Sequence, residues 1–367
     1  MTDLINRNMK FLQRPYSYIC FSLYSMTIKM LVMLCVQIIL LLISRSYQAF
    51  FVILASSAAT VLADLVWYFC TRQRNENVHS VLISIVQGLM CGMLIPQNYP
   101  LLAVFLVVFF AMLVSKNFFG GYSFTWINPC IFSAIILWIV GFELFPGFLI
   151  PIDSLASRNP SLILIESGAI PVCSFDSLIT DFLNENVFSW FKVSVPEGYV
   201  SLFWDTKSVI PAFRFNFATL VSSIILFCDN FEDMIIPGVF LFVYSFLIRI
   251  VSPFFFSGLM FQGDILLAIL TGGTFFCAFF ILNWMGTVPS TNYGKTVYAF
   301  VSAVAMFFIA GCGTSSCGGI FTVLVANICS IIIQQFEDYV ERTRLKRRLD
   351  EIHAEDLQIQ RGLYSHE

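Results

Sequence analysis

The chain has 367 residues, of which 58% are hydrophobic and only 12% are charged, and its formal net charge is −3. Its mean hydropathy of +0.83 and its shortage of charge exclude an ordinary soluble globular domain, in which about a quarter of the residues are charged. A lipid bilayer explains both features, because a surface that faces lipid needs no charge. We therefore expect an all-α polytopic membrane protein.

Ten apolar runs are long enough to cross a hydrocarbon core of roughly 30 Å. In chain order they cover residues 22–44, 48–70, 80–97, 99–115, 127–149, 209–228, 234–255, 264–283, 296–311 and 317–335. Pro96 and Pro100 indicate a tight turn between the third and fourth runs. Short spans interrupted by glycine, such as the last two runs, are typical of backbone that lines a cavity. The ten runs suggest two repeat-like halves, residues 22–149 and 209–335.

The basic residues give the chain a direction. With ten spans, thirteen of the twenty Lys and Arg residues fall on one side, among them Lys116 and the cluster at 342–348. Because cytoplasmic loops carry an excess of Lys and Arg, we predict that residues 1–21 and 336–367 are cytoplasmic and that the loop 150–208 is extracytoplasmic. The basic cluster in the tail favours anionic lipid headgroups.

Asp64 is the deepest charged residue in the predicted spans, within the sequence Ala-Asp-Leu-Val-Trp. A carboxylate inside a membrane is costly enough to require a partner, which the sequence does not name. A pathway role, a packing role and a position near the end of a span are all compatible with this pattern.

The sequence predicts no metal site and no self-contained catalytic site. It contains no nucleotide-binding loop, no zinc-protease motif and no CxxC pair, and its three histidines lie outside the spans, which excludes haem held by two histidines within the membrane. Cys312 and Cys317 are the only cysteines with a deliberate spacing. They are read either as buried thiols in a Gly-rich turn or as ligands of an iron–sulfur centre, although no histidine lies near them.

Three segments resemble the RnfD/NqrB family of membrane subunits of ion-translocating electron-transfer complexes. Lys116 is followed by Gly120-Gly121 and then by Asn128-Pro129, similar to the family's K-x-x-x-G-G…N-P element. The stretch 270–280, Leu-Thr-Gly-Gly-Thr-Phe-Phe-Cys-Ala-Phe-Phe, is similar to its L-x-G-x-T-x-x-x-A-F-F pattern, and 321–327 to its closing A-x-L-x-A-N pattern. The similarity extends over nearly the whole chain, and the length fits RnfD better than NqrB.

The resemblance implies a flavin cofactor. Gly120, Gly121, Asn128, Gly272 and Thr274 lie at corresponding interruptions of the two halves, and paired broken segments of this kind indicate a binding site at a repeat interface. Close helix packing through small residues explains the glycines equally well. Family members also carry flavin mononucleotide (FMN), joined through its phosphate to a threonine of an S-G-A-T-P-L-like motif.

The family's flavin-bearing threonine is absent from this chain. The matching segment reads Ser167-Gly168-Ala169-Ile170-Pro171, and isoleucine has no hydroxyl that can form a phosphoester. The flavin is then either held without a covalent bond by the amides of residues 167–169, attached at another hydroxyl, or lost. Trp284-Met285 in place of Asp-Pro, and Cys317 in place of an aspartate, also depart from the family pattern and put a cation-binding role in doubt.

Two functions follow as hypotheses. The first is a subunit of an Rnf-type complex in the inner membrane, which couples electron transfer between ferredoxin or flavodoxin and NAD to ion translocation. Such a chain would need the other membrane and peripheral subunits, would not be catalytic alone, and would bind no nucleic acid. The second is a secondary transporter or vitamin-type permease with internal repeats, which the Gly-interrupted segments and Asp64 fit as well.

Overall fold

The structure is a computed structural model of the chain. It describes residues 23–71, 78–118, 127–147, 160–168, 171–192, 194–227, 234–255, 263–284, 286–311, 315 and 317–364. These residues form helices joined by turns, and no β-strand occurs among them. The expected all-α fold is confirmed for this part of the chain.

The described residues of the first half form five α-helices. They are α2 (Leu23–Ile43), α3 (Tyr47–Thr71), α4 (Val78–Met93), α5 (Leu101–Met112) and α6 (Pro129–Val140). A π-helical turn, η1 (Leu113–Asn117), extends α5, and a 3-10 turn, η2 (Phe142–Leu144), follows α6. Asn128 caps α6, because its side-chain oxygen accepts the Cys130 amide at 3.0 Å while Pro129 occupies the first helical position, where its missing N–H costs nothing.

The second half contains interrupted helices. Its elements are α10 (Asn216–Phe227), α11 (Ile235–Phe246), η7 (Leu247–Val251), α12 (Ser252–Phe255), α13 (Ile265–Leu270), α14 (Thr274–Phe276), η8 (Cys277–Ile281), α15 (Asn292–Ile309) and α16 (Gly318–Tyr364). Between the halves lie five short elements: α7 (Pro160–Glu166), α8 (Asp176–Asn186), η4 (Phe188–Phe191), α9 (Tyr199–Trp204) and η5 (Pro211–Phe213).

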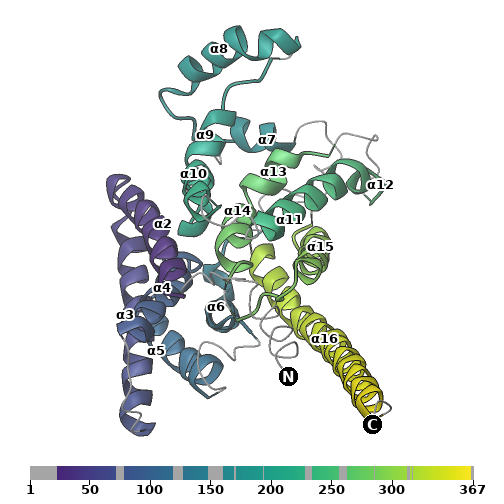
Figure 1. Cartoon of the computed structure of the whole chain (residues 1–367). Helices are drawn as coiled ribbons and strands as arrows, with labels where there is room; N and C mark the ends of the chain where they lie inside the picture. The colour runs from purple at the N-terminus through teal and green to yellow at the C-terminus, as the bar shows by residue number, and fades with distance from the viewer. Residues whose placement is uncertain are drawn as a thin grey trace.

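The helices gather in two groups that meet through central elements. Helices α2 to α5 lie on one side of the molecule and α11, α15 and α16 on the other, with α6, α10 and α14 between them (Figure 1). Helix α10 packs against α2, and α16 packs against α6, so elements from the two predicted halves are in contact. Helix α8 lies away from this body and is connected to it through α9 (Figure 1).

Small residues set the closest helix contacts. Helices α3 and α4 approach so tightly at Gly88 that an added Cβ atom would lie 2.5 Å from the Cα atom of Ser57, and at Gly92 it would lie 2.6 Å from that of Ile53. Lipid provides no hydrophobic force between helices, so close backbone packing of this kind holds membrane helices together.

Helix lengths qualify the predicted spans. Four helices among the described residues are long and apolar enough to cross a membrane, namely Tyr24–Ile43, Tyr47–Thr71, Ile235–Phe255 and Gly318–Asp350. Other runs form shorter apolar helices; α6 and α10 have 12 residues each, which is about 18 Å. The chain is therefore a multi-pass protein by its long helices, but the count of ten spans is not confirmed.

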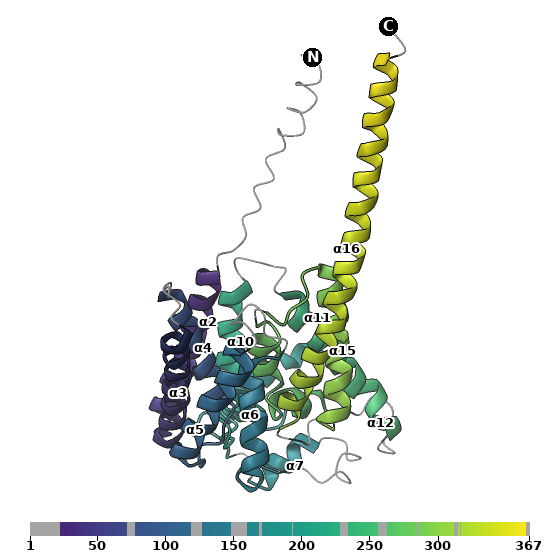
Figure 2. The same cartoon turned by 90° about the horizontal axis from the view of Figure 1, so that it is seen from below.

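Helix α16 continues well beyond its apolar part. Its 47 residues correspond to a length of about 70 Å, and its C-terminal part projects beyond the other helices (Figure 2). The predicted boundary between the last span and the tail, at 335, is thus not a break in the helix. The side chains of Phe336, Tyr339 and Leu349 on this extension are exposed.

Candidate functional site

A buried ion pair joins the two sides of the first helical group. Asp64 lies on α3, and Lys116 lies in η1 at the end of α5. The Lys116 Nζ atom is 2.6 Å from Oδ2 of Asp64, and the two side chains are only 4% and 12% exposed. A carboxylate inside a membrane requires a partner, and Lys116 is the partner of Asp64. Lys116 was counted among the basic residues that flank the spans, but its side chain is buried in this ion pair.

Two polar side chains complete the cluster around this pair. The Ser84 hydroxyl, on α4, lies 2.8 Å from Lys116 Nζ and also contacts the Asp64 carboxylate. The Asn117 amide donates to Oδ1 of Asp64 at 3.2 Å. The π-helical turn directs consecutive residues, Lys116 and Asn117, at the same carboxylate, and π-turns of this kind are frequent at functional sites. We call these four side chains the Asp64 cluster.

Polar groups continue from the Asp64 cluster along the α3–α4 contact. The hydroxyl of Thr60, one turn from Asp64, donates to the Ser84 carbonyl at 2.9 Å. The hydroxyl of Ser56, one turn further along α3, donates to the Gly88 carbonyl at 2.9 Å. Both side chains are buried. Together with the Asp64 cluster, Thr60 and Ser56 form a row of hydroxyls that we call the α3–α4 polar seam.

Three buried amide side chains lie near the contact between the halves. Both polar atoms of Gln87 and of Asn327, and the Nδ2 atom of Asn128, have no hydrogen-bond partner among the described residues. Gln87 lies on α4, Asn128 at the start of α6 and Asn327 on α16, and α6 packs against both α4 and α16. The Cys130 thiol lies 3.2 Å from the Gln87 carbonyl oxygen, which places α4 beside the start of α6.

These amides are chemically unusual for a membrane interior. An unpaired buried amide costs free energy, so such a group in a native protein calls for a ligand, a water or an ion. Gln87 follows Ser84 by three residues, so it lies one helical turn from the Asp64 cluster on α4. Gln87 therefore adds a buried amide to the face of α4 that carries Ser84.

The predicted interruption at Gly272 and Thr274 is present, between α13 and α14. Gly273 has a φ of +66°, and a Cβ atom there would lie 1.9 Å from the Phe213 ring. The Thr274 hydroxyl is fully buried and donates to the Ala268 carbonyl at 2.8 Å. The described contacts of this break are therefore packing contacts, as in the second of the two interpretations of the glycines.

The segment that matches the family's flavin-bearing loop follows α7. The amides of Ser167 and Gly168 donate to the carbonyls of Ile163 and Ile165, at 3.0 and 3.1 Å, and close the last turn of the helix. These two amides are thus not available to a phosphate, and a helix C-terminus carries a partial negative charge that disfavours an anion. Ala169 and Ile170 lie outside the described residues, as do Gly120 and Gly121.

Two of the residues that depart from the family pattern, Trp284 and Cys317, are buried. Trp284 is buried at 1% exposure and Cys317 at 6%, whereas Met285 and Cys312 lie outside the described residues. Within the described part of the chain, no three His, Cys, Asp or Glu side chains are grouped closely enough to hold a metal ion.

A second buried ion pair lies outside the spans predicted for the first half. Arg214 donates from Nε and Nη2 to the two carboxylate oxygens of Asp205, at 3.0 and 2.7 Å, and from Nη1 to the Ser46 hydroxyl. This fork connects the segment before α10 to the turn between α2 and α3. All its donors fix backbone segments to one another, which is a structural role.

The fold and these sites define a multi-pass α-helical membrane protein with a polar seam buried between its helices. The chain belongs to the NQR2, RnfD, RnfE family, whose model matches residues 12–341. It is similar to the RnfD subunit of the ion-translocating oxidoreductase complex of Salmonella enteritidis PT4, at 25% identity over 81% of this chain and 86% of the relative. The protein of the same name from Shigella boydii serotype 18 is 24% identical over 80% and 85%.

Most of the Asp64 cluster and two of the three amides were not predicted from the sequence. Lys116 was noted only as part of a motif and as a flanking charge, Asn327 only as the end of the closing motif, and Ser84 and Gln87 were not singled out. A signal was present, because Ser84 and Gln87 are polar residues three apart in an otherwise apolar run, and this spacing places both on one face of a helix.

Proposed function

We propose that this chain is a membrane subunit of an Rnf-type complex that couples electron transfer, between ferredoxin or flavodoxin and NAD, to ion translocation. Family membership over residues 12–341 and the names of the relatives support this assignment. On this reading the chain acts only with the other membrane and peripheral subunits. No contact among the described residues favours a stand-alone transporter or permease.

The Asp64 cluster is the observation that supports ion movement through this subunit. Asp64 offers a carboxylate to a cation, Ser84 and Asn117 offer neutral polar atoms beside it, and Lys116 balances its charge when no cation is present. A cation that reaches Asp64 displaces the Lys116 ammonium, which keeps the Ser84 hydroxyl as a partner.

Flavin is the second part of the proposal, without a covalent bond at Ile170. The side chain of isoleucine cannot form the phosphoester, and the amides of Ser167 and Gly168 are engaged in the end of α7. The unpartnered amides of Gln87, Asn128 and Asn327 offer donors and acceptors of the kind that the carbonyl and N–H edge of a flavin ring needs. A flavin bound there supplies one-electron and two-electron transfer within the membrane.

Two matched variants test the ion-pathway role. In membrane vesicles that contain the whole complex, we expect Asp64→Asn to lower the charge moved per electron transferred, measured with a potential-sensitive dye against NAD reduction. Asp205→Asn is the control, since it breaks the other buried ion pair. It should lower stability and leave the ratio of charge to electrons unchanged. An unchanged ratio in Asp64→Asn would show that the cluster is only structural.

The flavin proposal is tested separately. The denatured wild-type chain should show no flavin fluorescence in a gel, whereas Ile170→Thr, produced together with a flavin transferase, should become fluorescent. Fluorescence of the denatured wild-type chain would mean that another hydroxyl carries a covalent flavin.

We also propose that the chain lies in the inner membrane with both termini in the cytoplasm and residues 150–208 outside. The bias of Lys and Arg supports this direction. In a chain whose native cysteines are replaced by serine, labelling of intact cells with a membrane-impermeant thiol reagent should modify Trp190→Cys and not Tyr339→Cys, because both positions are exposed but lie in the loop and the tail. The opposite pattern would reverse the orientation.

A further inference from the structure

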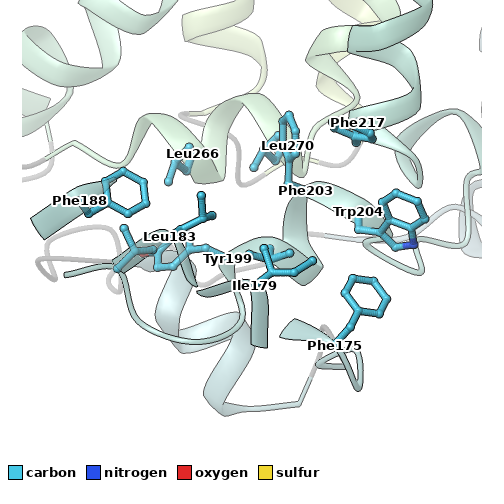
Figure 3. A pocket seen from close by; sticks show the side chains of 12 residues that line it. Phe175, Ile179, Leu183, Phe188, Tyr199, Phe203, Trp204, Phe217, Leu266 and Leu270 are labelled. Atoms are coloured by element: carbon cyan, nitrogen blue, oxygen red, sulfur yellow. The ribbon is translucent and has the colours of Figure 1, made fainter. Parts of the chain in front are cut away.

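A large apolar cavity lies under α8, outside the sites described above. Its volume is about 690 Å³, and side chains from α8, η4, α9, α10 and α13 line it (Figure 3). The lining includes Phe175, Ile179, Phe188, Tyr199, Trp204 and Leu270. Its size is that of a small-molecule site.

Polar contacts outside the cavity fix its wall. Asp176, at the start of α8, is fully buried and accepts the amides of Gly198 and Ser201 at 2.8 and 2.6 Å, which fastens α8 to the start of α9. Asn184, near the end of α8, donates to and accepts from the backbone of Val195. The wall is therefore held in place by bonds that do not need a ligand.

The interior offers almost nothing to a polar ligand. Eleven of the twelve lining residues have apolar or indole side chains, and the Tyr199 hydroxyl is already within 2.8 Å of the Ser161 hydroxyl. A peptide segment would bring backbone N–H and C=O groups that the lining does not pair. The lining thus fits an unbranched or weakly branched hydrocarbon chain better than a peptide or a polar cofactor.

A second apolar groove adjoins the cavity, and the packed rings of Trp204 and Phe217, with centroids 5.9 Å apart, lie between the two. This groove, of about 240 Å³, lies between α2 and α10 and shares Trp204 and Phe217 with the cavity. Val36 of α2 and Val221 of α10 line it and are exposed on the surface of the molecule. Because α2 is long and apolar enough to cross a membrane, its exposed apolar face is suited to contact with lipid.

We propose that the cavity binds an acyl chain of a membrane phospholipid, which enters from the bilayer between α2 and α10 and passes Trp204 and Phe217. The bilayer supplies this ligand at the mouth of the groove, and burial of the chain removes apolar surface of α8 and α9 from water. The loop segment that contains α8 is then anchored to the membrane through a bound lipid. This inference does not depend on the proposed ion or electron transfer.

Adjacent residues of α8 provide a matched test. Ile179 lines the cavity, whereas Leu178 is 72% exposed and does not line it. Membranes that contain the full chain are loaded with a phosphatidylcholine that has a photoreactive diazirine at the end of one acyl chain, illuminated, and mapped by peptide mass spectrometry. We expect adducts on the peptides of α8 and α9. Ile179→Asp should reduce them at least tenfold, and Leu178→Asp should leave them within twofold of wild type.

A second variant guards against misfolding. Ile179→Trp keeps the wall apolar and narrows the cavity, so it should also reduce the adducts while the thermal stability of the protein stays near that of wild type. Adducts confined to α2 and α10 in the wild-type protein would overturn the proposal, as would equal labelling of Ile179→Asp and wild type.

Discussion

Replacement of Lys116 by methionine gives the sharpest physical test of the Asp64 cluster. Methionine has a similar length and volume but no charge, so the change leaves the Asp64 carboxylate buried beside Ser84 and Asn117 without its cation. The two hydrogen-bond donors that remain are neutral, and they compensate the lost ion pair only in part.

The expected magnitude follows from this burial. Removal of one partner of a buried ion pair costs about 3–5 kcal/mol, because the other charge is left uncompensated. Asp64→Asn alone leaves a buried ammonium and should cost a similar amount. The double variant Asp64→Leu with Lys116→Met removes both charges, and apolar replacement of a whole buried pair is often neutral. We therefore expect the double variant to be more stable than either single one.

The assay is thermal unfolding in detergent, followed with a maleimide dye that becomes fluorescent on reaction with thiols. Cys91 and Cys130 are fully buried on α4 and α6, close to the cluster, so they react only when these helices separate. Additive losses in the double variant, with no recovery, would refute the electrostatic argument. A double variant that recovers stability but not charge transfer would separate the structural role of the cluster from its functional one.

Three further predictions concern other parts of the molecule. Asp176 is buried, which by itself raises its pKa, but hydrogen bonds from Ser201, Gly198 and Thr180 outweigh this effect and hold the pKa below its usual range. Its stabilisation of the loop is therefore complete above the ordinary aspartate pKa of about 3.9 and is lost as the pH falls through the lower folded value. The protection of the Gly198 amide against hydrogen exchange, relative to the unfolded chain, should fall in that window, and constant protection would contradict the assignment. Gly273→Ala should lower the free energy of unfolding by more than about 2 kcal/mol, because Gly273 has a positive φ and an added Cβ would meet the Phe213 ring. In the same thermal assay, Gly272→Ala should stay within about 1 kcal/mol of wild type, because its added Cβ meets nothing closer than 3.7 Å. Gln87→Leu should stabilise the flavin-free protein by about 1–2 kcal/mol, because it removes an unpaired buried amide. It should also lower the amount of flavin that the protein retains on purification. An unchanged flavin content would show that Gln87 is not part of the proposed site.

Part of this architecture follows from simple sequence rules. Helix α3 begins and ends within one residue of its predicted limits, and α2 ends within one residue of its own, because their apolar runs are long and uninterrupted. The break at Gly273 was also predicted, since glycine adopts a positive φ without the steric cost of a Cβ atom. These features depend on residues that are close in sequence, and such residues can be read without knowledge of the fold.

The Asp64 cluster depends on residues that are distant in sequence. The need for a partner of Asp64 could be predicted, but the identity of that partner could not. Membrane energetics demanded a partner for Asp64, but Lys116 is 52 positions away and follows an apolar run, where a lysine normally marks the end of a span. The helix instead continues as a π-turn through Asn117 and carries Lys116 back toward α3. No periodicity in the sequence indicates a π-turn, because it adds only one residue to a regular helix.

The two buried ion pairs differ in a way that supports a functional role for only one. Arg214 holds Asp205 with two donors of a rigid fork and uses a third for Ser46, so its release would break three bonds at once. Lys116 is a single ammonium on a flexible stem, and the Ser84 hydroxyl at 2.8 Å is an alternative partner when the carboxylate is occupied. The ammonium of Lys116 can therefore leave Asp64 and return to it while it keeps one hydrogen-bond partner, whereas the arginine fork is suited to permanent closure. Lys116→Arg would keep the charge but add the fork. For this reason it should lower the charge moved per electron in membrane vesicles, while thermal unfolding stays close to that of wild type.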